Sequence, residues 1–390
     1  MRTSTTPRQP RFLENLLFGT TFDQVPSLIP GVALASVVVL VAAALAELTS
    51  NALGYEGLVS FILVAIVLGM IIRNTVGLRD GFAPGIAFTL KKVLRLGIIL
   101  LGIRLSILDV LEIGGFGIPI VVGAVLTGLL VTTAATRWLG LSDRLGTLIA
   151  IGTAICGATA IVATAPGIKA KEQEVAYAVA NITIFGIAAM FIYPFLGNMI
   201  LGGDVTQIGL FMGTAIHETA QVAGAGLIYD QSFDITTSPS GADIAVIAKL
   251  VRNALMVVAI PAITYVYARR RDQDQMGAAH RTELRKLFPV FIIGFLVMAG
   301  IRSFGDAAID SGGQAFGVFG LEAWSDLTRW IRTWAEYTLP TAMAGVGLGT
   351  SISQLKGLGF KPFVVGIAAA LAVGVASIGL VSLFGPLISV

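Results

Sequence analysis

Charge is scarce in this chain, and its scarcity excludes an ordinary soluble domain. Only 13% of the 390 residues are Asp, Glu, Lys or Arg, whereas 55% are hydrophobic. A soluble globular domain carries about 25% charged residues. The net charge of +3 is small, and we attribute it to loop Lys and Arg residues rather than to a nucleic-acid surface. The composition therefore predicts a protein embedded in lipid.

Cysteine and histidine are almost absent. Cys156 is the only cysteine, which excludes an intrachain disulfide and gives no sign of a Cys-based metal site. His217 and His280 are too few for a His-rich metal centre. The chain also lacks a GxxxxGK[ST] phosphate loop, a specific Ser-His-Asp arrangement and, in HETAQ, the second histidine of the HExxH zinc-protease motif. We expect no enzyme activity, no cofactor and no metal.

Long apolar runs occupy most of the sequence. A membrane-spanning helix needs about 20 mostly apolar residues, and about eleven runs approach or exceed that length. The sequence thus predicts an all-α polytopic membrane protein with about eleven transmembrane helices. The runs are 28–48, 57–73, 86–108, 115–138, 146–165, 174–198, 206–228, 242–268, 287–304, 334–352 and 360–388.

Lys and Arg residues in the short loops set the expected orientation. They precede the first run and follow the second, fourth, eighth and tenth, so all lie on one side if the N-terminus is cytoplasmic and the C-terminus outside. The exception is the loop GIKAKEQE after the fifth run, which places Lys169 and Lys171 outside. Residues 305–333 are too polar for a span. Because Trp324 and Trp330 suit the headgroup level, we expect there a short outer-surface helix or an ordered loop.

Internal similarities indicate inverted halves, as in many transporters. Lys92-Val-Leu-Arg95 resembles Lys249-Leu-Val-Arg252, and residues 102–123 resemble 345–366. GTAI also occurs twice, but in the fifth and seventh runs, which have the same direction in this topology and do not fit the same duplication. The tenth run is then the expected counterpart of the fifth. The organisation that fits best is a cytoplasmic segment 1–27, an extra helix 28–54, and two inverted five-helix repeats, 55–204 and 205–390, with discontinuous crossed helices.

The two GTAI stretches interrupt their apolar runs with polar and small residues. They read Gly152-Thr-Ala-Ile-Cys-Gly-Ala-Thr-Ala160 and Gly213-Thr-Ala-Ile-His-Glu-Thr-Ala-Gln221. Unpaired backbone survives at membrane depth only in protein or beside a cavity, and half-helix N–H groups there attract anions. Close packing through small residues is the alternative. From these stretches we predict the following substrate-binding residues: Thr153, Cys156, Gly157, Thr159 and Thr214.

His217, Glu218 and Gln221 place titratable and polar groups near the centre of the seventh run. Such groups are costly in a membrane and are usually functional. Imidazole titrates near working pH, so we predict that His217 and Glu218 carry coupling protons and that Gln221 orients them. The alternative is a structural network in which Glu218 pairs with Lys249 or Arg252.

Lys249, Arg252 and Asn253 lie together on the eighth run. A cation at the bilayer centre costs at least about 2.5 kcal/mol, so its retention favours a use for the charge. The forked donors of arginine and the point charge of lysine suit a small anion, and we predict that these three residues bind one. An internal ion pair with Glu218 or Asp243 is the alternative.

The residues quoted above carry a family resemblance. AICGATAIVATAP, KEQEVAYAVANITIFGIAAMFIYP, GLFMGTAIHETAQVAGAG, KLVRN and KKVLRLGIILLGIRLS are similar to the YeiH-type family of bacterial sulfate exporters. The resemblance covers roughly residues 55–390. It implies an inner-membrane protein related to the bile-acid/sodium symporter class of folds, and it implies a sulfur oxyanion as substrate. Asn253 departs from the family pattern, in which an apolar residue is expected after Arg252.

These observations predict a secondary transporter of a small anion, either sulfate or a related sulfur oxyanion or sulfonate. It works by alternating access and is coupled to protons. One alternative is a sodium-coupled symporter of an organic anion, with the cation held by carbonyls at the helix breaks together with Glu218 and Gln221. The other is a non-transporting membrane sensor or partner subunit. The expected partners are the anion and the lipid bilayer, without nucleic acid, and a homodimer stays open as the oligomeric state.

Overall fold

The computed structural model describes residues 17–53, 60–270, 290–351 and 359–388, together with Arg11 and Glu14. Within those ranges every regular element is a helix, apart from one bridge between Ala315 and Phe319. The all-α prediction is confirmed. The basic residues predicted in the loop after residue 270 and at Lys356 lie outside the described ranges. Chain contacts divide the protein into two compact units, Met1–Leu100 with Trp330–Ser351, and Leu101–Arg329 with Ile352–Val390.

The first unit is built from close helix contacts around small residues. A buried cluster joins Ala35 and Val38 to Ala65, Ile86 and Leu348. The third predicted run is helical from residue 83 to 104 and contains one π-helical turn. The elements are η1 (Phe22–Leu28), α2 (Ile29–Leu53), α3 (Phe61–Thr75), η2 (Asp80–Phe82), α4 (Ala83–Phe88), η3 (Thr89–Val93), α5 (Leu94–Leu101) and the later part of α16 (Leu321–Gly349).

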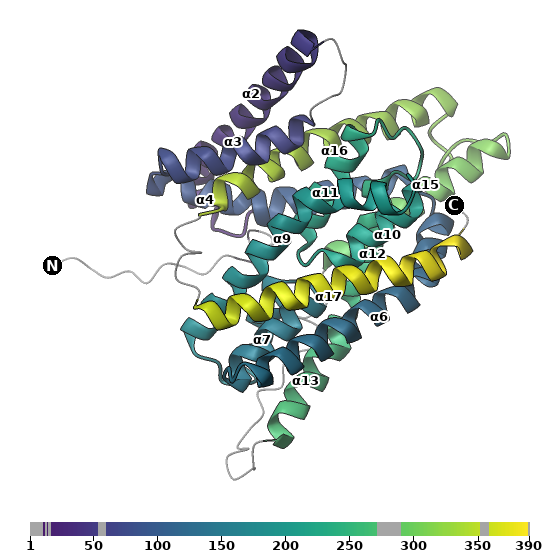
Figure 1. Cartoon of the computed structure of the whole chain (residues 1–390). Helices are drawn as coiled ribbons and strands as arrows, with labels where there is room; N and C mark the ends of the chain where they lie inside the picture. Colours follow the sequence, from purple (N-terminus) through teal and green to yellow (C-terminus); the bar gives the residue numbers. More distant parts are fainter. Residues whose placement is uncertain are drawn as a thin grey trace. The chain divides into compact units, whose positions relative to one another are not determined.

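The second unit holds every predicted site residue. Helices α9, α10, α11 and α12 lie together, and α17 runs along α6 (Figure 1). Its elements are η4 (Gly102–Arg104), α6 (Ile107–Trp138), α7 (Asp143–Ala154), α8 (Ala158–Thr164), α9 (Glu172–Ile200), α10 (Val205–Ala215), α11 (Thr219–Ser232), α12 (Gly241–Ala254), α13 (Met256–Arg270), α15 (Val290–Asp310), the start of α16, α17 (Phe360–Phe384) and η6 (Gly385–Leu387).

Helices α7 and α8 form a hairpin, which we call hairpin A. Ser142 caps the start of α7 by accepting the Leu145 N–H, and its hydroxyl also donates to Glu174 Oε1 at 2.9 Å. Arg144 pairs with the same Glu174 carboxylate, 3.1 Å away, at the start of α9. Leu145 and Ile168 share one buried cluster although α7 and α8 lie between them. The chain therefore enters and leaves this hairpin at one end, and the predicted fifth run is two helices that fold back on each other rather than one continuous helix.

Helices α10 and α11 form a second hairpin, hairpin B, whose first arm runs parallel to α12. A Cβ on Gly209 would lie 3.0 Å from the carbonyl oxygen of Gly241, the first residue of α12. One turn further on, a Cβ on Gly213 would lie 2.4 Å from the carbonyl oxygen of Ala245. The contacts advance together along both helices, so α10 and α12 start at the same end.

The second arm of hairpin B runs back along α12. Thr219 at the start of α11 accepts a hydrogen bond from Asn253 Nδ2 at 3.0 Å, near the end of α12. Gly226, two turns later, packs against Ala242 at the beginning of α12. The predicted seventh run is therefore also two antiparallel helices rather than one continuous helix. Hydropathy cannot detect either reversal, because it measures apolar length and not chain direction.

The remaining predicted runs agree with the structure in part. Among the described residues, five helices are long and apolar enough to span a membrane, and α12 with α13 gives a sixth with a 40° bend. The total of eleven is therefore not confirmed. Helix α16 is continuous to Gly349, unlike the broken fifth segment that was expected to be its counterpart.

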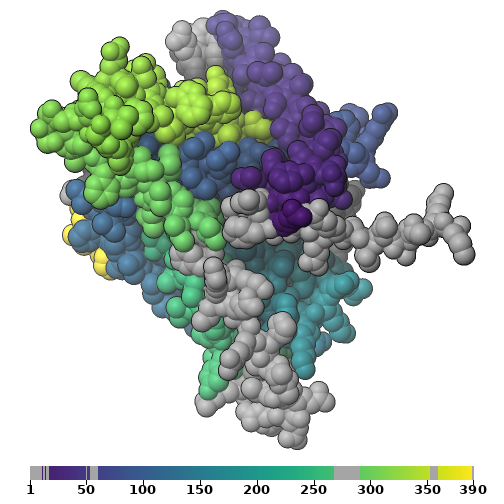
Figure 2. Space-filling model, turned by 180° about the vertical axis from the view of Figure 1, so that it is seen from behind, coloured from purple at the N-terminus to yellow at the C-terminus, as the bar shows by residue number. Residues whose placement is uncertain are grey.

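The segment 305–333, expected as a short surface helix or an ordered loop, contains the end of one long helix, a connecting loop and the start of another helix. Helix α15 extends to Asp310, and α16 begins at Leu321 and runs on without interruption. Trp324 is 3% exposed, lies over Gly305 and donates its indole N–H to Asp306 at 2.7 Å. Burial of this tryptophan holds the segment against α15, and residues 300–330 form one green surface block in Figure 2.

Candidate functional site

The tips of the two hairpins meet within the second unit. Tip A comprises residues 155–157 and tip B residues 216–218, each between the two arms of its hairpin. A Cβ on Gly157 would lie 3.3 Å from Glu218 Cβ and 3.3 Å from Ile182 Cγ2 of α9. Gly157 has a φ of +70°, which an L side chain rarely adopts. Glycine at this position thus permits both the turn and the close approach of the tips.

Arg252 of α12 binds the carbonyl ends of both inward helices. Its Nε donates to the Ala154 carbonyl at 2.7 Å, and Nη2 donates to the Thr153 carbonyl, both at the end of α7. Its Nη1 donates to the carbonyls of Thr214 (2.7 Å) and Ile216 (3.1 Å) at the end of α10. The last carbonyls of a helix lack partners within the helix. One fully buried guanidinium therefore supplies hydrogen-bond donors to the last carbonyls of both helices.

Lys249, one turn earlier on α12, binds the tips themselves. Its Nζ donates to the carbonyls of Ile155 at 3.1 Å, Ile216 at 2.9 Å and His217 at 2.5 Å. The residue is fully buried. Neither predicted use of the two cations describes these contacts, since their hydrogen-bond partners are backbone carbonyls. Asp243 pairs instead with Arg104 at 3.5 Å.

The predicted coupling residues lie at tip B. His217 is buried, and its Nδ1 has no hydrogen-bond partner within the described part of the chain. Glu218 is partly exposed and forms the N-cap of α11, where its N–H donates to Gln221 Oε1 at 3.3 Å. Gln221 in turn donates to the Thr183 carbonyl of α9 at 3.4 Å. Gln221 therefore ties tip B to the middle of α9.

The other predicted substrate residues differ in their surroundings. Thr153 and Asn253 are buried, and Thr153 Oγ1 and Asn253 Oδ1 have no partner among the described residues. The Thr214 hydroxyl is used within its own helix, at 2.7 Å from the Leu210 carbonyl. Thr159 is exposed, so the structure does not bring its side chain into the buried cluster.

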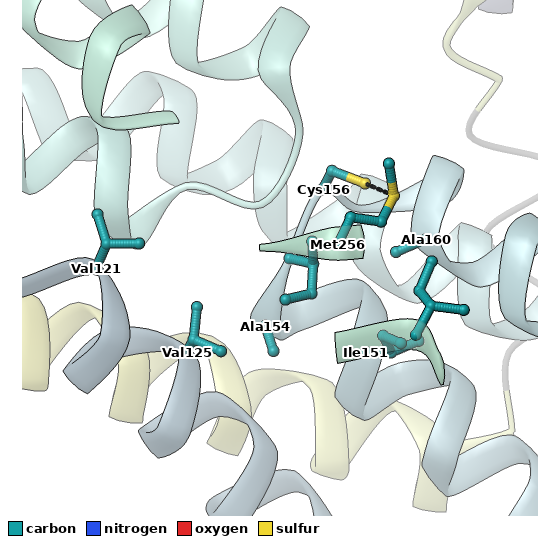
Figure 3. Packing of buried hydrophobic residues seen from close by; sticks show 9 residues of the cluster. Val121, Val125, Ile151, Ala154, Cys156, Ala160 and Met256 are labelled. Carbon is teal, nitrogen blue, oxygen red and sulfur yellow. Dashed lines mark hydrogen bonds between the residues drawn. The ribbon is translucent and has the colours of Figure 1, made fainter. Parts of the chain in front are cut away.

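Cys156 lies at tip A but in an apolar setting. Its Sγ is 3.4 Å from Met256 Sδ, and both belong to a buried cluster with Val121, Val125 and Ile151 (Figure 3). This packing fixes tip A against α6 and α13. The cluster presents no charged or hydroxyl side chain to the sulfur, so the thiol is a packing group in this structure.

Sequence reasoning missed two contributors to the site. The Thr219 hydroxyl accepts a hydrogen bond from Asn253 Nδ2. Because this hydroxyl belongs to the HETAQ motif, its residue type was a sufficient signal that Thr219 belongs to the site. The second is the set of backbone carbonyls at the two helix ends, which were considered as ligands of a sodium ion but not as partners of Lys249 and Arg252. No side-chain pattern reveals them, although the Gly and Thr interruptions mark where the helices stop.

Comparison with known proteins gives a consistent family match. The family model described as Conserved hypothetical protein 698 matches residues 30–366. A UPF0324 membrane protein of Streptococcus pyogenes serotype M18 is 32% identical over 316 residues, covering 81% of this chain and 87% of the relative. A UPF0324 membrane protein of Fusobacterium nucleatum is 30% identical, covering 83% and 90%. A Streptococcus agalactiae relative with the same family name is 29% identical, covering 85% and 92%.

Proposed function

We propose, on the premise that this chain belongs to the UPF0324 family of membrane proteins, that it is a secondary transporter of a small anion. UPF0324 and the YeiH-type family are the same family, so the resemblance carried by CGATAIVA and HETAQV is confirmed. Sulfate or a related sulfur oxyanion is the proposed substrate, and the bacterial inner membrane is the proposed location. The observation that carries the proposal is the meeting of two helical hairpin tips around buried cations.

The hairpins support an inverted repeat of a different register from the five-helix one. GTAI occupies the corresponding place at both tips, and the hairpins enter from opposite ends of α9. In opposite orientation the two GTAI stretches fit one duplication, which they could not do as parallel spans. The loop with Lys169 and Lys171 then lies at the same end as Arg144, on the cytoplasmic side, as the distribution of basic residues requires. With both hairpins folded back, the N-terminus stays cytoplasmic and the C-terminus outside.

The positive charges at the tips favour an anion. Lys249 and Arg252 bring two positive charges against the single carboxylate of Glu218, and oppositely charged ligands are attracted to such a site. The hydroxyl of Thr153 and the amide oxygen of Asn253 are buried with no partner in the described chain, as is His217 Nδ1. A protonated oxyanion, or a donor that lies between the oxyanion and these atoms, can form hydrogen bonds with them. The two cations then act by their field and by holding the tips, because nearly all their N–H groups already bind carbonyls.

Protons are the proposed coupling ions, carried by Glu218 and His217. The sodium-coupled alternative requires carbonyls at the helix breaks to hold the cation. The carbonyls of Ile155, Ile216 and His217 instead accept hydrogen bonds from Lys249. This occupancy favours the proton over sodium.

The test is radiolabelled sulfate flux into proteoliposomes under an imposed pH gradient or sodium gradient. We expect the pH gradient to drive flux in the wild type. Glu218→Gln, which keeps the size of the side chain and cannot titrate, should retain sulfate exchange and lose its response to the pH gradient. Flux driven by sodium alone would favour the symporter. Absence of flux for sulfate and a panel of other small anions would contradict transport and favour the sensor or partner subunit.

A further inference from the structure

Lys249 performs a task that anion transport does not require. A cation that binds an anionic substrate directly would keep donors free to meet it, but the Lys249 ammonium points its three N–H bonds at three backbone carbonyls, which leaves it only its field to act on an anion. These belong to Ile155 of tip A and to Ile216 and His217 of tip B, at 3.1, 2.9 and 2.5 Å from Nζ. The side chain is fully buried.

The number of acceptors favours the charged form of this group. A protonated lysine has three N–H donors, and a neutral amine has two. Three carbonyl oxygens within 3.1 Å of Nζ are satisfied together only by the ammonium. Lys249 is therefore a cation surrounded by oxygen atoms, as an alkali ion would be.

The surroundings provide the field that such an ion needs. Helices α7 and α10 both end here, and the C-terminus of a helix carries roughly half a negative charge. Two such ends together offset about one positive charge. Backbone carbonyls replace the hydration shell of alkali ions in ion channels, and half-helix C-terminal ends coordinate sodium in transporters.

We propose that the carbonyl ends of α7 and α10 form a cation cage, made of the carbonyls of Ile155, Ile216 and His217, which Lys249 fills as a tethered ion. Shortening Lys249 opens this cage to sodium or to a small amine. The inference rests on the contacts of Lys249 and not on the proposed substrate, so it stands or falls separately from anion transport.

The experiment compares Lys249→Ala with Lys249→Met in the full-length chain. Alanine removes the ammonium and leaves space, whereas methionine has a similar length, fills the space and carries no charge. Unfolding of the purified proteins is followed by reaction of Cys156, the only thiol, with a maleimide fluorophore. Each protein is heated in sodium, potassium, methylammonium or choline chloride at equal ionic strength. Choline is too large for the cage and serves as the reference salt.

The Lys249→Ala variant should melt below the wild type in choline, and its Tm should rise in sodium or methylammonium. A cation at a hundred times its Kd gives a rise of roughly 4 °C for a chain of this size. The Tm of the wild type should be the same in all four salts, and the Tm of Lys249→Met should likewise not change with the salt. Equal melting of Lys249→Ala in every salt would overturn the proposal. So would a sodium response in the wild type, or failure to recover Lys249→Ala in any salt while Lys249→Met is recovered.

Discussion

Replacing Arg252 with alanine should release tip A, and the size of the effect can be worked out from its contacts. Four carbonyls accept hydrogen bonds from this guanidinium, and Ile216 keeps a second donor in Lys249. The carbonyls of Thr153, Ala154 and Thr214 lose their side-chain partner. A buried polar group left without a partner costs about 1–3 kcal/mol. For three carbonyls, the lower bound gives a loss of stability of roughly 3 kcal/mol.

The single thiol of the chain lies beside these carbonyls and reports the release directly. Cys156 is 5% exposed in the folded protein and follows Ile155 in tip A. When local opening is fast and labelling is slow, the labelling rate follows the population of the open state. A destabilisation of about 3 kcal/mol therefore predicts roughly a hundredfold faster reaction with a maleimide.

The control variant is Arg329→Ala. Arg329 forms an ion pair with Asp326 at 3.2 Å, and both side chains are mostly exposed. Such pairs contribute about 0–1 kcal/mol, so labelling of Cys156 should stay near the wild-type rate. Arg252→Lys should give an intermediate rate, because one ammonium cannot reach all the carbonyls that the fork reaches. A wild-type labelling rate in Arg252→Ala would refute the capping of α7 and α10 by this residue.

Two glycine substitutions test the packing of the hairpins, each beside a matched glycine in open space. Gly157→Ala should lower the Tm by more than Gly140→Ala, because both have positive φ and only Gly157 is crowded; the strain alone costs about 1–2 kcal/mol. Gly213→Ala should destabilise by about 1–3 kcal/mol through overlap with the Ala245 carbonyl. Gly115→Ala, which meets nothing within 4 Å, should leave the Tm unchanged or raise it. Equal Tm values within either pair would contradict the packing described.

The sequence predicted the helical segments well because apolar length has a direct physical cause. Most of the described runs appear as helices near their predicted bounds, and the two GTAI interruptions were located correctly. Their geometry was not predicted, since a hairpin and a crossing helix need similar compositions. The signal that could have corrected this was Lys169 and Lys171 on the outer side, the one violation of the charge rule.

The roles of the buried cations were harder to predict for a different reason. Sequence patterns present side chains as candidate partners, so Glu218 and Asp243 were the obvious choices for Lys249 and Arg252. The observed partners are carbonyls that become available only where a helix ends. If both interruptions had been known to end a helix inside the protein, two partially negative helix ends would have been placed beside Lys249 and Arg252, the fully buried cations among the described residues of the second unit.

The shared capping of α7 and α10 limits how the protein can move. Arg252 and Lys249 each bind both hairpins, so a hairpin that opened alone would leave several buried carbonyls unpaired at a cost of several kcal/mol. Motion that keeps both hairpins fixed to α12 breaks none of these bonds. The two hairpins and α12 therefore move as one rigid body. A ligand bound at the tips moves with that body and is not released by the opening of one hairpin alone.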